Sequence, residues 1–192
     1  MRSIAFLLSC GALLGGCGAQ SGPGKQSPTP LDSVVAAGSR ATAVTRATSH
    51  VISSTGRDLG TLMISDSGRT LSIMGTLRGL PPGVHGVHFH TVGKCDAPAF
   101  TTAGDHWNPT SKQHGIENPL GPHLGDLQNI TVGADSTADV RVATTGGSLS
   151  GTNAMLGAAG AALVVHASVD DYKTDPSGNS GGRIACGVIG RS

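Results

Sequence analysis

The sequence predicts an all-β domain, a sandwich or barrel of short strands, for three reasons. Apolar and polar residues alternate in several stretches, which is typical of strands with one buried face. The 192 residues include 30 glycines and are only 3% aromatic, a composition that favours strands, tight turns and long loops over helices. No amphipathic segment of the sequence is longer than two helical turns, so we expect no substantial helix.

The strand pattern begins near residue 41 and continues to the C-terminus. Residues 59–65 (LGTLMIS) and 69–77 (RTLSIMGTL) are expected to form two strands joined by a turn at DSGR. Residues 84–92 (VHGVHFHTV) are expected to form another strand, entered through GLPPG. The remaining predicted strands are 127–132 and 138–144, which we expect to pair as a hairpin, followed by 161–167 and 183–190.

Two connections are unusually long for a compact β domain, at residues 93–126 and 168–182. The first contains four prolines and almost no periodicity. Loops of this length are usually functional or disordered. Both are polar, and the first is rich in histidine, so we expect both to carry function.

The N-terminus is expected to be an export signal and tether, not part of the domain. A positively charged start is followed by an apolar run at residues 4–14 that is too short to span a bilayer. The sequence LLGGC resembles a bacterial lipoprotein box. That resemblance implies that residues 1–16 are a cleaved signal peptide and that Cys17 is lipidated. A plain secretory signal is the alternative.

Residues 17–40 are rich in Gly, Ser and Pro, which predicts a flexible linker between the lipidated cysteine and a folded domain at 41–192. We therefore expect an exported protein of the cell envelope or periplasm, anchored to a membrane. The formal net charge of +1 argues against nucleic acid as a partner. Cys95 and Cys186 remain outside the signal, and two cysteines in an exported domain commonly pair.

The histidines follow a pattern typical of a metal site. Residues i and i+2 of a strand share a face, so His88 and His90 are expected to lie side by side. Alone, this pair is equally compatible with two hydrogen-bonded histidines, while His85 is expected to be structural and His50 to lie on the surface. Imidazole suits copper and zinc, and carboxylate suits zinc. Further candidate ligands are His106, His114, His123 and Asp126 in the first long loop and His166 in a later strand.

Six short motifs follow one another along residues 59–190: GVHGVHFH, AGDHWNP, KQHG, PHLGDL, LVVH followed by DD, and GGRIACGVIG. In order and spacing they resemble the copper/zinc superoxide dismutases, and the N-terminus suggests an exported, lipoprotein-type bacterial member. Six motifs in order are far more specific than any one of them. The resemblance implies a Greek-key β-barrel or sandwich of about eight antiparallel strands, an immunoglobulin-like fold with two long functional loops.

The resemblance also implies a role for individual residues. It implies one copper ion per chain bound by His88, His90, His106 and His166, and one zinc ion bound by His106, His114, His123 and Asp126. The imidazolate of His106 would bridge the two ions. Asp170 would orient metal-bound histidines, which commonly donate their second N–H to a carboxylate. Arg183 would dock the substrate, and Cys95 and Cys186 would form a disulfide.

The implied activity is the conversion of two superoxide anions into dioxygen and hydrogen peroxide by copper redox cycling, which would protect the cell envelope. His106 and Arg183 would be the catalytic residues, and a homodimer is a possible assembly. The main alternative is a superoxide-dismutase-like protein that binds both metals without turnover. A serine hydrolase using GNSGG at residues 178–182 would need a preceding strand and a following helix, and neither is expected there.

The chain departs from the family pattern at two positions. Pro176 lies near where many relatives carry a lysine, which leaves electrostatic steering of the substrate open, with Lys173 as a candidate replacement. Asp105 directly precedes His106, where many relatives carry an uncharged residue. It either perturbs that histidine or faces solvent.

Overall fold

The computed structural model describes residues 45–192 of the chain. In this range it contains one short 3₁₀ helix, η1 (Thr101–Ala103), and nine strands. The strands are β1 (Arg46–Ser53), β2 (Asp58–Asp66), β3 (Thr70–Arg78), β4 (Gly83–His85), β5 (Val87–His90), β6 (Ile130–Val132), β7 (Thr137–Thr145), β8 (Ala162–His166) and β9 (Arg183–Arg191). The expected all-β class is therefore confirmed.

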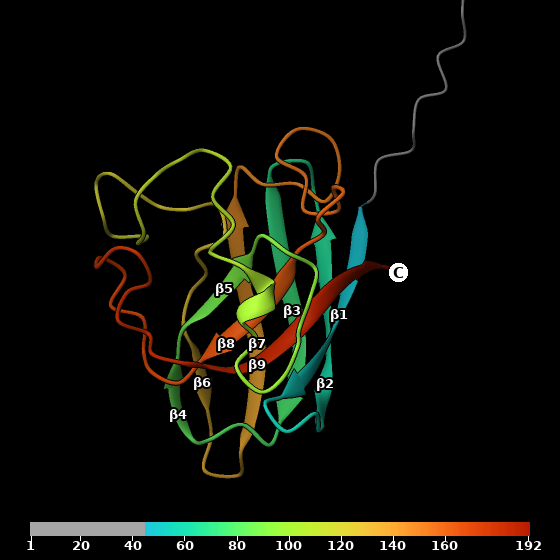
Figure 1. Ribbon diagram of the computed structural model, residues 1–192, viewed down its shortest axis with the longest axis vertical. Coiled ribbons are helices and arrows are strands. Elements are labelled where there is room, and N and C mark those ends of the chain that lie inside the picture. The colour runs from blue at the N-terminus through green and yellow to red at the C-terminus, as the bar shows by residue number, and fades with distance from the viewer. Residues whose placement is uncertain (1–44) are drawn as a thin grey trace, which may run out of the picture. The chain divides into compact units, whose positions relative to one another are not determined.

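The strands form a curled antiparallel sheet of seven strands in the order β5-β8-β9-β1-β2-β3-β7, and a two-stranded sheet of β4 and β6 (Figure 1). Alternation along each strand decides which side chains are buried. In β2, Leu62 and Ile64 are buried, whereas Thr61 and Met63, which alternate with them, are exposed. The inward side chains of the strands meet in one large core. Each fully buried Leu or Ile side chain contributes about 1.5–3 kcal/mol to the free energy of folding.

The predicted strand at residues 84–92 is two strands, β4 and β5, which join different sheets. The break is at Gly86, where an added Cβ would lie only 3.0 Å from the Ser180 Cβ and 3.2 Å from the Asp170 Cβ. The chain therefore passes against the second long loop at this point. His85 lies in β4, and the pair His88 and His90 lies in β5.

The predicted hairpin of residues 127–132 and 138–144 is wrong in its pairing. A tight turn does connect β6 to β7, because the Gly133 N–H donates to the Thr137 carbonyl at 2.8 Å. Beyond this turn, β6 pairs with β4 and β7 pairs with β3. Sequence alternation predicts that a segment is a strand, but its partner is chosen by burial against distant segments.

Both predicted long loops are present, and the later part of the first loop lies on the same side of the strands as the second loop (Figure 1). The His114 N–H donates to Asp175 Oδ1 at 2.6 Å, and the Glu117 N–H donates to the Tyr172 carbonyl at 3.1 Å. Each loop is therefore held partly by the other. Among residues 45–192, no helix has the length and apolar character needed to cross a membrane. The predicted signal peptide, Cys17 and the linker lie outside the described residues.

Candidate metal centre

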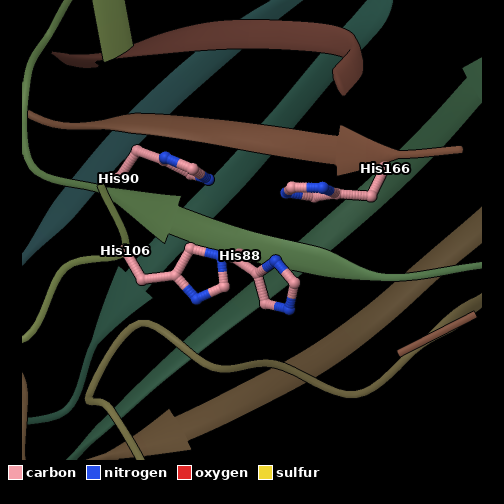
Figure 2. A group of neighbouring side chains, drawn as sticks. All are labelled: His88, His90, His106 and His166. Carbon is pink, nitrogen blue, oxygen red and sulfur yellow. The ribbon is translucent and has the colours of Figure 1, made fainter. Parts of the chain in front are cut away.

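Four buried histidines from three segments converge on one point (Figure 2). His88 and His90 are on β5, opposite Val164 and Ala162 of β8, and His166 ends β8. His106 comes from the first long loop and is placed by an isolated bridge to His90. One ring nitrogen from each of the four lies within 4.8 Å of the others. The structure thus brings together the four residues for which the family resemblance implies a copper site.

Three of these rings have one nitrogen bonded to the protein and a second that is buried without a hydrogen-bond partner. An unpaired buried nitrogen is costly, and here three lie in one cluster. Ring N–H groups anchored in this way are typical of metal ligands, and neutral imidazole suits copper. The anchoring bonds run from His88 Nε2 to Asp170 Oδ2 (2.7 Å), from His90 Nδ1 to the Gly104 carbonyl (2.8 Å) and from His166 Nδ1 to the Gly181 carbonyl (3.1 Å).

Burial keeps this cluster neutral in the metal-free protein. It lowers the pKa of His90 to about 2, that of His166 to about 3 and that of His106 to about 4. Burial also lowers the pKa of His88, against the opposing effect of its hydrogen bond to Asp170. A histidine must be neutral to bind a metal, so the cluster is prepared for an ion at neutral pH.

The second cluster is built around a single carboxylate oxygen, Asp126 Oδ1. The Nδ1 atoms of three histidines surround it, at 3.0 Å for His114, 3.2 Å for His123 and 3.3 Å for His106. Ligands about 2.0 Å from a tetrahedral zinc ion lie about 3.3 Å from one another. The Asp126 oxygen therefore lies at about the ligand spacing of a tetrahedral zinc site from each of the three ring nitrogens. The chemistry of the set, three imidazoles and one carboxylate, suits zinc.

His88 also lies near this second cluster, because one of its ring nitrogens is within 4.8 Å of donors from His106, His114 and Asp126. We assign the fourth corner to His123, whose Nδ1 meets the same Asp126 oxygen as the other two rings. The Nε2 of His88 is already bonded to Asp170, and its unpaired Nδ1 belongs to the first cluster. His106 is then the one residue shared by both clusters.

Asp170 connects the two clusters. Its Oδ2 accepts a hydrogen bond from His88, and its Oδ1 accepts one from His114 Nε2 at 3.0 Å. Burial raises the pKa of Asp170, but these bonds outweigh burial and hold the pKa below its usual value. Burial likewise lowers the pKa of His114, but the carboxylates of Asp126 and Asp170 overcome it and raise that pKa to about 9.

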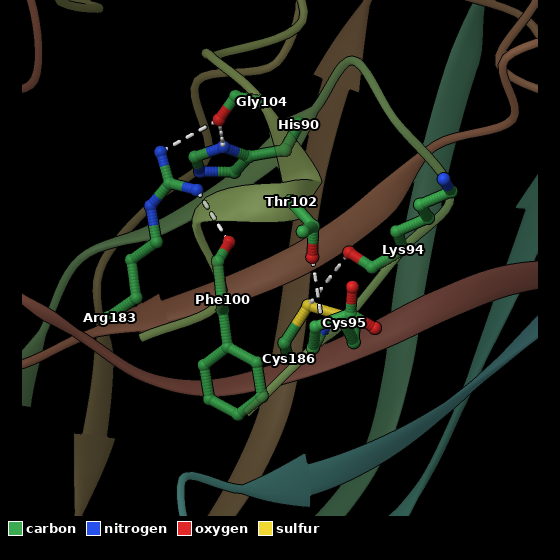
Figure 3. Close-up of a disulfide and its surroundings, with 9 residues drawn as sticks. His90, Lys94, Cys95, Phe100, Thr102, Gly104, Arg183 and Cys186 are labelled. Atoms are coloured by element: carbon green, nitrogen blue, oxygen red, sulfur yellow. Dashed lines mark hydrogen bonds between the residues drawn. A yellow bond between two sulfur atoms is a disulfide. The ribbon is translucent and has the colours of Figure 1, made fainter. Parts of the chain in front are cut away.

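Arg183 lies at the edge of the first cluster, where β9 begins (Figure 3). Its guanidinium donates to the carbonyls of Phe100 and Gly104, both at 2.7 Å. The Gly104 carbonyl also accepts the hydrogen bond from His90, so one oxygen positions both side chains. Arg183 lines a cavity of about 950 Å³ together with His106 and His166. This arrangement places a cation where a small anion would approach the first cluster.

Cys95 and Cys186 form a disulfide with a Cα–Cα distance of 5.6 Å (Figure 3). Cys95 precedes η1 in the first long loop, and Cys186 lies in β9. The bond therefore ties the loop segment that carries Gly104 to the strand that carries Arg183. This is the pairing that the family resemblance implies.

Several other residues are placed by the structure. Lys173 forms an ion pair with Glu117 at 2.9 Å and is not among the cavity-lining residues. Lys112, which the sequence reasoning missed, does line the cavity. Its position in KQHG, two residues before His114, was the available signal.

His85 is buried, with its ring nitrogens 2.8 and 2.9 Å from two backbone carbonyl oxygens, and the exposed His50 pairs with a surface carboxylate at 3.1 Å.

Comparison with known proteins agrees with this geometry. The family described as copper/zinc superoxide dismutase (SODC) matches residues 59–189. Cu-Zn superoxide dismutase 2 of Aquifex aeolicus is 38% identical over 149 residues, covering 75% of this chain and 86% of that protein. The superoxide dismutase-like protein YojM of Bacillus subtilis is 36% identical over 197 residues, covering 98% of this chain and 96% of that protein.

The fold agrees as well. The crystal structure of a SOD-like protein from Bacillus subtilis matches with a TM-score of 0.69 and 39% identity, covering 73% of this chain and 96% of that one. The expected enzyme class, an oxidoreductase, and the expected cofactors, copper and zinc, are those of the family. The chain belongs to the copper/zinc superoxide dismutase family.

Proposed function

We propose that this protein converts two superoxide anions and two protons into dioxygen and hydrogen peroxide. One observation carries the proposal: three buried, unpaired imidazole nitrogens lie in one cluster beside a cavity that is lined by a cation, Arg183. Copper, when bound there, supplies a one-electron redox couple, whereas zinc has none. The protein supplies the ligand geometry, the docking of the anion and the proton.

Arg183 is suited to docking because two of its N–H groups are fixed to carbonyls while others remain available. Burial lowers the pKa of Arg183, and the charge of Asp105 opposes this effect. A guanidinium remains charged at neutral pH. It would attract superoxide and orient it beside the histidine cluster.

His106 is suited to proton transfer because each of its nitrogens faces a different cluster. Its Nδ1 is 3.3 Å from Asp126 Oδ1, which leaves Nε2 for the copper cluster. We assign Nε2 as the atom that takes up a proton and later releases it to the product, with water as the source of the second proton. The other histidines of this cluster keep fixed ring orientations through their anchoring bonds.

The test is to measure bound copper and zinc per chain together with the rate of superoxide removal. The native protein is compared with His88→Ala and with a control, His50→Ala, at an exposed position outside both clusters. We expect His88→Ala to lose copper and activity, and His50→Ala to keep both. Activity that survives loss of His88 would overturn the copper assignment.

The second candidate function is copper and zinc binding without turnover. It is favoured by the similarity to YojM, which is named a superoxide dismutase-like protein and aligns over 98% of this chain. Against it, no expected donor residue is missing from the sequence, four histidines lie together at the first cluster, and three ring nitrogens surround the Asp126 oxygen at the second. Full occupancy of both metals with no superoxide removal would establish this second function instead.

We further propose that the enzyme works in the cell envelope, anchored through a lipid on Cys17. The lipoprotein-like sequence LLGGC and the Gly-, Ser- and Pro-rich segment after it support this. Cell fractionation of the native chain and of Cys17→Ser tests it. The native protein is expected in the membrane fraction and the variant in the soluble exported fraction; identical distributions would contradict the anchor.

A further inference from the structure

We propose that the negative charge of the Asp105 carboxylate lowers the rate at which the substrate anion reaches Arg183. An uncharged residue at this position would give a faster enzyme. The inference rests on the proposed function, because it concerns the capture of superoxide. The Asp105 charge would then act on anions that enter the cavity and not on His106.

Asp105 is exposed and lines the same cavity as Arg183, His106 and His166. Its backbone is fixed, because its carbonyl accepts hydrogen bonds from the Thr91 N–H at 3.0 Å and from Thr91 Oγ1 at 3.3 Å. Within residues 45–192, its carboxylate has no hydrogen-bond or ion-pair partner. Its negative charge is therefore not neutralised by direct contact with any described residue.

The Asp105 charge acts on the docking cation. The Arg183 guanidinium donates to the carbonyl of Gly104, the residue next to Asp105. In addition, the charge of Asp105 raises the pKa of Arg183, opposing the lowering by burial. Asp105 is thus electrostatically coupled to the group that attracts the substrate, and its sign is the same as that of the substrate.

Asp105 makes no direct polar contact with the His106 ring. The His106 Nδ1 lies 3.3 Å from Asp126 Oδ1, and among residues 45–192 no hydrogen bond or ion pair joins the Asp105 carboxylate to His106. Removing the Asp105 charge should therefore leave both metal clusters intact. Its effect should be on the approach of an anion from solvent.

The charged side chains that line the cavity are balanced in sign, so the loss of one negative charge changes the net charge that an anion meets. The charged residues that line it are Asp105, Lys112, Asp175 and Arg183, two of each sign. Without the Asp105 charge, the lining has a net positive charge. One unit charge acting through water over about 7 Å changes the local concentration of a monovalent anion about two- to three-fold. Salt suppresses such an effect.

The experiment compares the metal-loaded native protein with Asp105→Asn and with a control, Asp135→Asn. Asp135 lies in the β6–β7 turn, where an Asn oxygen can still accept the hydrogen bond that the Thr137 N–H donates at 3.1 Å. Both substitutions therefore change the net charge by the same amount. Copper and zinc content is measured in all three proteins.

Two quantities are measured at low and high ionic strength: kcat/KM for superoxide, and the Kd for azide, a stable monovalent anion, from copper(II) absorbance. We expect Asp105→Asn to raise kcat/KM and to tighten azide binding, each about two- to three-fold at low salt. Both gains should vanish near 0.5 M salt, where the Debye length is only about 4 Å. Asp135→Asn should match the native protein.

Azide and superoxide separate failure of this inference from failure of the proposed function. If the native protein binds azide but removes no superoxide, the proposed function fails, and azide affinity alone still tests the role of Asp105. If the native protein is active but Asp105→Asn does not differ from it at low salt, the inference is overturned. A gain that persists at high salt, or that Asp135→Asn shares, also overturns it.

Discussion

At the scale of single residues, the site is defined by which ring nitrogen of each histidine is already hydrogen-bonded to the protein. His88 uses Nε2 for Asp170, whereas His90 and His166 use Nδ1 for backbone carbonyls. The spacing of His88 and His90 predicts that they share a strand face. It does not predict which nitrogen remains unpaired, because that depends on acceptors from distant loops.

The residue scale also decides which lysine can steer the substrate. Lys112 lines the cavity, whereas Lys173 is paired with Glu117 away from it. We expect Lys112→Gln to lower kcat/KM about two- to three-fold at low ionic strength, because one attractive charge is lost. Lys173→Gln is the matched control and should have no such effect. Stopped-flow rates over a range of salt check this; equal effects of the two substitutions would contradict it.

His114 should make zinc binding depend on pH. Its pKa is raised to about 9 in the metal-free protein, so it is protonated at neutral pH. Because zinc needs the neutral ring, binding must release this proton, and the apparent affinity should fall about tenfold per unit as the pH drops below that pKa. Titration calorimetry in buffers of different ionisation enthalpy measures the proton released.

The control is copper binding to the first cluster, where burial lowers the pKa of His90 to about 2 and that of His166 to about 3. These rings are already neutral, so copper should release no proton from them near neutral pH. A zinc affinity that is constant between about pH 6 and pH 8 would contradict the role given to His114.

At the scale of elements, most strand ranges are predicted well, but β1 (Arg46–Ser53) was given no range and β4 and β5 were predicted as one strand. The predicted ranges 59–65 and 69–77 lie within one residue of β2 and β3, because alternation over many residues is a strong signal. The range 84–92 was predicted as one strand. It divides at Gly86 because the second long loop passes there, with Ser180 and Asp170 in contact range of an added Cβ.

The second long loop positions Asp170 through a glycine. Gly178 has φ +63°, and a Cβ at this position would overlap the Asp170 carboxylate. Gly178→Ala should therefore displace Asp170 from His88 and His114 and weaken binding of both metals about 10- to 100-fold, as loss of a ligand-orienting carboxylate does. Gly182→Ala is the control, because its added Cβ meets nothing within 4 Å. Competition with a chelator measures both affinities; native affinities in Gly178→Ala would contradict this.

At the scale of the whole molecule, the disulfide connects the first long loop to the sheet across 91 residues of sequence. Replacing both Cys95 and Cys186 with alanine should lower the free energy of unfolding by about 4–5 kcal/mol, because a long loop of the unfolded chain is no longer closed. Urea unfolding of the metal-free protein measures this.

The same replacement should lower activity more than it lowers copper content. Activity should fall because the loop segment whose Gly104 carbonyl fixes Arg183 becomes looser. Copper content should fall less because three histidines of the first cluster lie on β5 and β8. An unchanged free energy of unfolding would contradict the stabilising role. Equal losses of copper and activity would contradict the role of the disulfide in positioning Arg183.

The sequence by itself determined the all-β class, most of the strand ranges, the two long loops and the residue types of both expected donor sets. These follow from alternation and from the order of short motifs, which are local properties of the chain. Only the tertiary structure decided that β6 pairs with β4, that Lys112 rather than Lys173 lines the cavity, and that Asp105 faces it. These depend on contacts between segments far apart in sequence, where burial and hydrogen bonding select one arrangement among many that the local pattern allows.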